Sequence, residues 1–290
     1  MMHQTPLKIA VASGKGGTGK TTVATSLALS LAKNLTETVM FLDCDVEAPN
    51  AHLFLKPEFS DQKQVEVLIP RVNETLCTHC GKCTEVCQFQ AIAVLGQRTL
   101  VFPQLCHGCG SCTMICPTNA IQENPKSIGI LQKGKAEQIE FARGVMDIGE
   151  PMAVPIIRQL KKWVKSTPSQ ITIVDSPPGT ACPVVESMRG SDFILLVTEP
   201  TPFGLHDLRL AHQVAKELNI PTGLIINRDN GEFKELDNYC KAENLPVFLR
   251  IPFQRTIAEG IANGHTLVDI LPETILSFQE ICQTIRNIVK

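Results

Sequence analysis

Aromatic residues, excess charge of either sign and long apolar runs are all scarce in this sequence of 290 residues. Aromatic side chains make up 5% of it, with one tryptophan and one tyrosine, and 27 basic residues nearly balance 29 acidic ones. The net charge of −2 gives no electrostatic basis for a nucleic-acid partner. No apolar run approaches the roughly 18 residues that a membrane-spanning helix needs, and the first residues lack a basic region followed by an apolar stretch. We therefore expect neither export nor membrane insertion.

Cysteine, in contrast, is plentiful. Eight of the twelve cysteines fall into two closely spaced runs that are typical of metal ligands. In a long chain without an export signal, this usage favours bound metal over disulfides and a reducing, cytoplasmic location. The hydrophobic fraction of 43% and the length suit one large α/β domain with room for a small second one.

The segment 13–22, SGKGGTGKTT, contains the phosphate-loop pattern G-x4-G-K-[ST]. A strand-like apolar run (7–12) precedes it and a helical pattern (22–33) follows, which is the context that this motif requires. Its glycines let backbone N–H groups turn toward a phosphate, and the helix directs its positive end at the same anion. Lys20 adds charge near the β- and γ-phosphates, and Thr21 is expected to hold Mg²⁺. The expected nucleotide-binding residues here are Gly14, Lys15, Gly16, Gly17, Thr18, Gly19, Lys20, Thr21 and Thr22.

An ordinary phosphate loop has no need of a second lysine such as Lys15. With this lysine, KGGTGKTT resembles the variant loop of the MinD/ParA superfamily of dimeric P-loop ATPases. The resemblance implies that Lys15 reaches across a two-fold interface to the partner's ATP phosphates, as a trans-acting arginine finger does. Lys15 and Lys20 would then both act in hydrolysis. The alternative is that Lys15 is a solvated loop residue.

Acidic residues follow two further strand-like runs beside this loop. FLDCD ends at Asp45, and the run 171–175 ends at Asp175, followed by SPPGT. Ligands collect at the carboxyl ends of strands in open α/β sheets. The family resemblance implies that Asp45 lies in the first switch loop and positions the attacking water. It also implies that Asp175 contacts magnesium through water and that the N–H of Gly179 senses the γ-phosphate.

The same resemblance implies a base-binding residue near the end of the chain. The run 223–227 ends at Asn227, which matches an asparagine that recognises adenine in the MinD family, where its amide both donates and accepts. Pro252, after the run 247–251, is expected beside it. The last helical pattern, 273–289, lacks the basic face by which MinD proteins bind membrane. We expect it to pack on the chain's own sheet and not to form a stable membrane anchor.

The two cysteine runs share the spacing C-x2-C-x2-C-x3-C, and the second begins 29 residues after the first. The spacing resembles that of bacterial two-cluster ferredoxins, in which the fourth cysteine of each run ligates the other cluster. The resemblance implies one [4Fe–4S] cluster on Cys77, Cys80, Cys83 and Cys116, and a second on Cys87, Cys106, Cys109 and Cys112. Zinc is the competing metal, because two C-x2-C pairs can form a tetrahedral site. The spacing of each run fits the corners of a cubane better. Pro117 follows Cys116 as the ferredoxin pattern asks, whereas Gln88 follows Cys87.

The cysteine runs interrupt the ATPase signals, which resume after them. We therefore predict an inserted α+β, bacterial ferredoxin-like domain at 71–125 within an ATPase domain made of 1–70 and 126–290. The segment 127–144 predicts a hairpin that turns at its Lys-Gly-Lys sequence, residues 133–135. Alternating strand and helix patterns predict the α/β fold class, with a doubly wound, mainly parallel sheet.

Two functions from different classes follow from the resemblance. The first is nucleotide-gated electron transfer, in which ATP closes a homodimer, or a heterodimer with a paralogous ATPase, and two clusters meet a redox protein partner. The second is iron–sulfur or metallocofactor assembly, as in Mrp-type carriers. Those carriers use a C-x2-C pair in the ATPase domain, and no such pair lies outside the insertion. In the related nitrogenase iron protein, a cysteine after the second switch ligates a shared cluster. Cys182 either takes that role or is structural.

Overall fold

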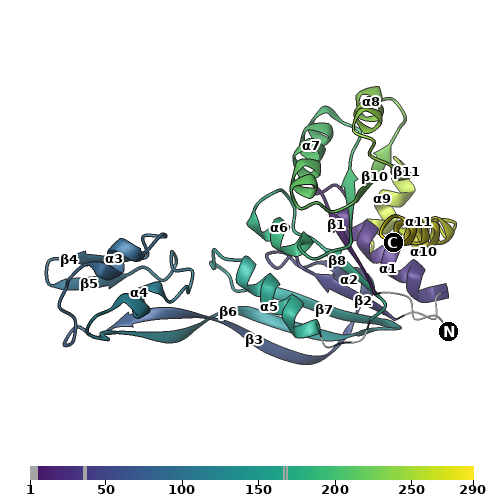
Figure 1. Cartoon of the computed structure of the whole chain (residues 1–290). Helices are drawn as coiled ribbons and strands as arrows, with labels where there is room; N and C mark the ends of the chain where they lie inside the picture. Colours follow the sequence, from purple (N-terminus) through teal and green to yellow (C-terminus); the bar gives the residue numbers. More distant parts are fainter. Residues whose placement is uncertain (1–5, 35–37, 166, 168) are drawn as a thin grey trace.

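The computed structural model describes residues 6–34, 38–165, 167 and 169–290. It consists of an α/β body from which a two-stranded ribbon carries a small cysteine-rich unit (Figure 1). The first five residues and residues 35–37 lie outside the described part, so the expectation of no export signal is not addressed there. The apolar pattern from Leu35 to Met40 predicts a strand, whose first residues also lie outside the described part.

One sheet of nine strands runs through the described residues, in the order β11-β10-β9-β1-β8-β2-β7-β6-β3. Neighbours from β11 to β7 are parallel, and β6 and β3 join antiparallel at one edge. This confirms the predicted doubly wound, mainly parallel sheet. The strands are β1 Leu7–Ala12, β2 Val39–Asp43, β3 Glu58–Val72, β6 Ile121–Ala136, β7 Ile139–Met146, β8 Ile171–Asp175, β9 Phe193–Thr198, β10 Thr222–Asp229 and β11 Val247–Pro252.

Helices cover both faces of the sheet, and each face has its own apolar core. One face carries α1 Lys20–Asn34, α2 Ala51–Leu55, α9 Arg255–Ala262, α10 Leu267–Ile270 and α11 Thr274–Ile288. The other carries α5 Val154–Val164, α6 Cys182–Met188, α7 Pro202–Glu217 and α8 Lys234–Ala242. Central strands such as β1 and β8 are buried on both faces, which explains their continuous apolar sequences.

The last helix, α11, packs as expected against the body. Phe278, Ile281 and Ile285 are buried in the core that α1 shares with the sheet. Among the described residues, no helix has both the length and the apolar character that crossing a membrane requires.

The predicted hairpin is present, but its turn was placed wrongly. Strands β6 and β7 pair through Ala136 and Ile139, so the chain turns at Glu137, whose φ of 52° lies in the left-handed region. Gly134 is a strand residue instead. A Cβ there would lie 1.9 Å from the carbonyl oxygen of Glu58, so this glycine permits the close approach of β3. The Lys-Gly-Lys sequence therefore marks a strand contact and not a turn.

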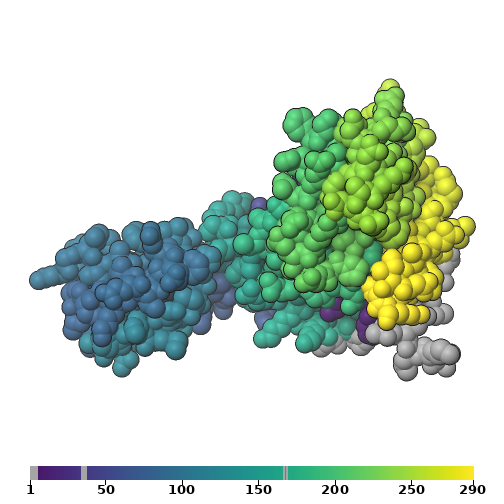
Figure 2. All heavy atoms as spheres, turned by 45° about the horizontal axis from the view of Figure 1, so that its top comes forward, coloured from purple at the N-terminus to yellow at the C-terminus, as the bar shows by residue number. Residues whose placement is uncertain are grey.

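The ribbon of β3 and β6 extends beyond the body and ends in the cysteine unit, residues 73–120. The unit contains α3 Lys82–Val86, α4 Ser111–Ile115 and a hairpin of β4 Ile92–Leu95 and β5 Arg98–Val101. Figure 2 shows it as a lobe joined to the body through a narrower neck. β3 and β6 run without interruption through residues 71 and 125, the predicted ends of the insertion.

Candidate functional site

The loop between β1 and α1 has the backbone that its glycines permit. Gly17 and Gly19 have φ of 79° and 93°, in the left-handed region that favours glycine. At Gly14 the constraint is space, because a Cβ would lie 2.0 Å from the carbonyl oxygen of Asp207 on α7. The loop is therefore packed against α7 at its start and opens its backbone toward the pocket at its end.

A pocket of about 410 Å³ lies over this loop and the start of α1. Its lining includes Gly16, Gly17, Gly19, Lys20, Thr21, Thr22 and Asp45, together with Asn227, Arg228, Pro252 and Phe253 among others. Gly14, Lys15, Thr18, Asp175 and Gly179 are not in this lining. The pocket thus brings together residues of the phosphate loop and residues at the ends of β10 and β11, which are far apart in sequence.

Three carboxylates gather at the carboxyl ends of β2 and β8. Asp43 pairs in register with Asp175 across the two strands, and both are completely buried. Burial and the charge of Asp175 raise the pKa of Asp43 well above its ordinary value. Asp43 also accepts hydrogen bonds from the N–H groups of Asp45 and Ala51, at 3.2 and 3.1 Å. It therefore holds the segment after β2 in place.

Of these three carboxylates, Asp175 is the one with two buried oxygens that lack a partner among the described residues. Burial raises its pKa to about 7, against the attraction of Lys20 and the Thr21 hydroxyl. Among the described residues, neither of its oxygens has a hydrogen-bond partner of normal geometry, and the hydroxyls of Thr18 and Ser176 are also buried without partners. Unpaired buried oxygens are costly unless a ligand satisfies them. Hard oxygen donors around a lysine fit a magnesium–phosphate group.

The segment after β8 is tied to the phosphate loop. The N–H of Gly179 donates to the carbonyl oxygen of Ser13 at 3.1 Å, and Gly179 has a φ of 96°. Cys182, at the start of α6, is exposed. Asp45 is partly buried, and burial raises its pKa while Lys20 opposes the rise.

Lys15 and Asn227 both have partners within the chain. The Lys15 ammonium lies 3.8 Å from a carboxylate oxygen of Glu199, and the Lys15 carbonyl accepts from the Ser13 hydroxyl at 2.6 Å. The Asn227 amide donates to the carbonyl oxygen of Thr18 at 2.8 Å. Asn227 therefore supports the phosphate loop in addition to lining the pocket.

The eight clustered cysteines surround two separate small cavities in the cysteine unit. Cys77, Cys80, Cys83 and Cys116 line one cavity. Cys87, Cys106, Cys109 and Cys112 line the other. Each cavity thus takes three cysteines from one run and one from the other, so the chain crosses between them. Every cysteine in the described residues is a free thiol.

The internal duplication is visible in the backbone. Helices α3 and α4 begin after Gly81 and Gly110, which have φ of 79° and 74°. The N–H groups of Ala91 and Ala120 donate to the sulfurs of Cys87 and Cys116, at 3.2 and 3.3 Å. Hydrogen bonds to thiolate sulfur are a feature of iron–sulfur sites. Burial raises the pKa of the Cys83 and Cys106 thiols, so a bound metal must displace their protons.

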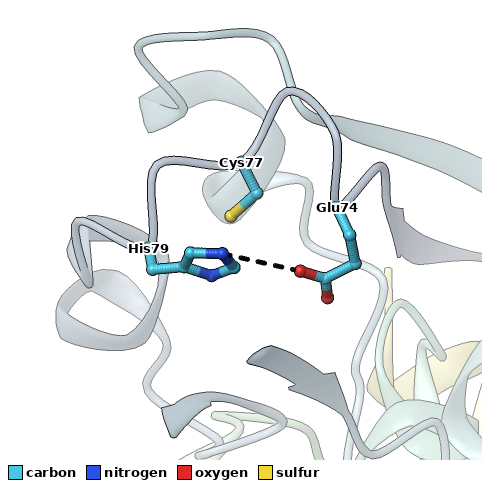
Figure 3. A group of neighbouring side chains, drawn as sticks. All are labelled: Glu74, Cys77 and His79. Atoms are coloured by element: carbon cyan, nitrogen blue, oxygen red, sulfur yellow. Dashed lines mark ion pairs between the residues drawn. The ribbon is translucent and has the colours of Figure 1, made fainter. Parts of the chain in front are cut away.

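One of these cysteines has titratable neighbours (Figure 3). Ligand atoms of Glu74, Cys77 and His79 lie within 4.8 Å of one another. Glu74 and His79 have other contacts, however. The Glu74 carboxylate accepts from the N–H of Thr99 at 3.1 Å, and the His79 ring lies 3.3 Å from the Thr99 hydroxyl. These two side chains fix the loop around Cys77, and the four cysteines of the cavity are the more complete donor set.

Sequence reasoning missed several residues at these sites. Arg228 lines the pocket, and Glu199 faces Lys15. Lys161 on α5 donates to three carbonyl oxygens at the end of α6. None belongs to a motif, although Arg228 directly follows the predicted Asn227.

Comparison with known proteins agrees with this geometry. Residues 9–268 match the model of the CobQ/CobB/MinD/ParA nucleotide binding domain. MinD of Pyrococcus horikoshii, solved with Mg-ADP, superposes with a TM-score of 0.60 over 99% of both chains at 19% identity, which shows a shared fold.

The sequence relatives include proteins that are named as carriers or assembly factors of iron–sulfur clusters. The uncharacterized protein MJ0578 of Methanocaldococcus jannaschii is 31% identical over 98% of both chains. An iron-sulfur cluster carrier protein of Pyrococcus horikoshii is 28% identical over 74% of this chain and 58% of its own length. A cytosolic Fe-S cluster assembly factor of Drosophila simulans is 27% identical over 76% and 67%. With its phosphate loop, its sheet and a family match over most of its length, the chain belongs to the CobQ/CobB/MinD/ParA nucleotide-binding family.

Proposed function

We propose that this protein is a dimer-dependent ATPase that uses nucleotide to control electron transfer through two iron–sulfur clusters. The observation that carries the proposal is the placement of two complete cysteine tetrads, around separate cavities, on a ribbon that grows from the sheet of a nucleotide-binding body. Fixed donor sets of this kind suit clusters that stay in place. ATP, Mg²⁺ and two [4Fe–4S] clusters are the proposed ligands.

At the nucleotide end, Lys20 and Thr21 bind the phosphates and Mg²⁺, and Asp175 contacts the metal ion through water. The unpaired oxygens of Asp175 support this role. Asp45 lines the pocket and orients the attacking water. Lys15 supplies charge to the nucleotide of a second copy, in line with its position outside the lining of its own pocket. Asn227 and Pro252 bind the base.

At the other end, the two tetrads hold the clusters, which supply one-electron chemistry when bound. Cys80 and Cys109 are exposed, so each donor set reaches the surface of the cysteine unit. That exposure permits a redox protein to approach both. The free thiols imply a reducing, cytoplasmic setting, with no nucleic-acid or membrane partner.

Coupling between the two ends has a continuous route that starts at the second switch. The segment containing Gly179 leads into α6, and the Lys161 ammonium donates to the carbonyl oxygens of Glu186, Ser187 and Arg189, at 2.8, 3.0 and 2.6 Å. Arg158 on α5 adds two hydrogen bonds to the Glu186 carboxylate. A shift of α6 is therefore transmitted to α5.

Helix α5 in turn holds the base of the ribbon. The Gln159 amide donates to the carbonyl oxygen of Glu66 in β3 at 3.0 Å, and Ile156 packs in the core with Val65 and Leu131. The Lys126 ammonium in β6 pairs with the buried carboxylate of Glu150 at 2.7 Å. Motion of α5 therefore changes the direction in which the ribbon leaves the body.

A redox titration of the cluster-loaded protein, with and without a non-hydrolysable ATP analogue, tests the gating. A coupling of about 1–3 kcal/mol is typical between sites and corresponds to a midpoint shift of roughly 40–130 mV for one electron. Coincident titration curves, together with unchanged binding of a redox partner, would contradict the proposal.

Iron–sulfur or metallocofactor assembly is the second candidate, because relatives of this chain are named cluster carrier and assembly factor. Incubation of the loaded protein with an apo-acceptor, with or without Mg-ATP, separates the two functions. Transfer of iron and sulfide to the acceptor supports assembly. Clusters that stay bound and cycle under reductant support electron transfer.

A further inference from the structure

The Lys15 side chain is held inside its own subunit by a carboxylate that no motif identifies. Its ammonium lies 3.8 Å from a carboxylate oxygen of Glu199, with Lys15 33% and Glu199 14% exposed. This separation is at the long end of ion pairing, and such partly exposed pairs contribute little and break readily. The contact therefore places Lys15 beside Glu199 and is weak enough to be exchanged.

The backbone fixes both partners. The Ser13 hydroxyl donates to the Lys15 carbonyl, and Gly14 packs directly against α7. Glu199 follows β9, the strand beside β1, and its carbonyl accepts from the N–H of Thr201 at 2.8 Å. A Cβ at Gly204 would lie 2.2 Å from that carbonyl, so α7 closes tightly over Glu199. The two side chains face each other because of these restraints.

A second cation lowers the free-energy cost of moving Lys15 away from Glu199. The guanidinium of Arg228 donates to the other carboxylate oxygen of Glu199 at 2.6 Å. When Lys15 leaves, Glu199 therefore keeps a charged partner, and no buried carboxylate is stranded. Arg228 also lines the nucleotide pocket, so Glu199 stands between the base end and the lysine.

We propose that Glu199 is a positioning residue that retains Lys15 in the free subunit and sets how readily Lys15 transfers to the nucleotide phosphates of a second copy of this chain. The inference rests on the proposed role of Lys15 across a dimer. On this inference, Glu199 sets the protein concentration at which dimerisation and hydrolysis begin.

The experiment measures the ATPase rate per subunit of the full chain against protein concentration at saturating Mg-ATP. Glu199→Gln preserves the shape of the side chain and removes its charge. We expect the midpoint concentration to fall about two- to fivefold, the range set by an exposed ion pair, while the maximal rate stays within about twofold. Glu199→Asp, which keeps the charge, should return the midpoint toward that of the parent protein.

Two further variants test whether the change in midpoint concentration is specific to the Lys15–Glu199 contact. Glu243→Gln removes the Lys216–Glu243 ion pair between α7 and α8 and should leave the midpoint unchanged. Arg228→Gln leaves Glu199 with Lys15 alone, so the midpoint should rise once nucleotide affinity has been measured separately by fluorescent-nucleotide titration.

The outcomes distinguish a failure of the role of Lys15 across the dimer from a failure of the role of Glu199. If Lys15→Ala hydrolyses ATP with the parent concentration dependence, the role of Lys15 across a dimer is wrong. If Lys15→Ala loses that dependence while Glu199→Gln keeps the parent midpoint, only the role of Glu199 is overturned. Thermal melting of each variant identifies loss of folding. If Glu199→Gln does not fold, the midpoint concentration of Glu199→Asp is compared with that of the parent protein, and a midpoint unchanged despite the shorter side chain overturns the role of Glu199.

Discussion

The backbone N–H of Gly179 donates to the carbonyl oxygen of Ser13, so the segment after β8 is bonded to the start of the phosphate loop. The same N–H is proposed to sense the γ-phosphate, and one N–H cannot serve both acceptors fully. This role predicts that ATP binding exchanges one acceptor of the Gly179 N–H for another, at the segment that leads into α6.

Replacing Gly179 by alanine tests this exchange. No atom lies within 4 Å of the added Cβ, but the φ of 96° disfavours any side chain, so we expect a loss of about 1–2 kcal/mol in the free energy of unfolding. Gly231→Ala is the matched control, with a φ of 74° and open space. Both variants should lose similar stability in urea titrations, and Gly179→Ala alone should lose ATP hydrolysis. Equal ATPase activity in the two would contradict the sensor role.

The buried carboxylate of Asp175 predicts a pH dependence. Its pKa is raised to about 7 in the folded chain from an ordinary value of 3.8. Between these values the folded state binds a proton that the unfolded state has released, so the free energy of unfolding falls as pH rises from about 4 to 7. Asp175→Asn should flatten this fall and stabilise the nucleotide-free protein by on the order of 1–3 kcal/mol at pH 7.5, with little effect near pH 4. Urea titrations at several pH values measure the free energy of unfolding of both proteins. Parallel curves of this free energy against pH for the parent protein and Asp175→Asn would refute the prediction.

The crossed cysteine sets predict selective loss of iron. Cys116→Ser removes one donor from the cavity of Cys77, Cys80 and Cys83, so the anaerobic iron content should fall from about eight to about four per chain. Cys87→Ser should have the same effect on the other cavity. Cys182→Ser, far along the sequence in α6, is the control and should retain all the iron. Loss of iron in the control would instead favour a cluster that Cys182 shares between subunits.

Lys161 predicts a variant that separates hydrolysis from gating. Lys161→Met keeps most of the apolar stem of the side chain but leaves three carbonyls at the end of α6 without their donor, at a cost of about 1–3 kcal/mol in stability. ATP should still be hydrolysed, while the nucleotide-dependent shift in cluster potential should shrink or vanish. Lys162→Met changes the exposed neighbour and is the matched control. A full shift in Lys161→Met would exclude α5 as the route.

Local patterns were sufficient for much of this molecule. The phosphate loop and the strands that end at Asp43 and Asp175 follow from short-range chemistry, and the structure contains each of them. The helical spacing of Ile156, Ile157, Leu160 and Val164 likewise predicts a helix over 151–165, and α5 buries all four. The register of Asp43 against Asp175 could not be derived, because it depends on strands separated by more than a hundred residues.

Other features depend on long-range packing and left no signal in the sequence. The first half of β3, with Ser60, Asp61 and Lys63, is polar and exposed, so hydrophobic periodicity cannot find it. Gly134 resembled a turn residue because its need for space comes from Glu58, which is remote in sequence. The contact of Lys161 with α6 likewise joins two helices that only the folded sheet brings together.

The cysteine unit has almost no hydrocarbon interior of its own. Two apolar clusters lie in and beside it, each with three buried members of which one is a cysteine: Ala91 and Cys106 with Ile69 of β3 in one, and Cys83 and Ile92 with Ile121 of β6 in the other. Domains this small generally need metal or covalent crosslinks to remain folded. Under iron starvation the cysteine unit should therefore lose its structure and become sensitive to proteases, while the body continues to fold and to recognise nucleotide.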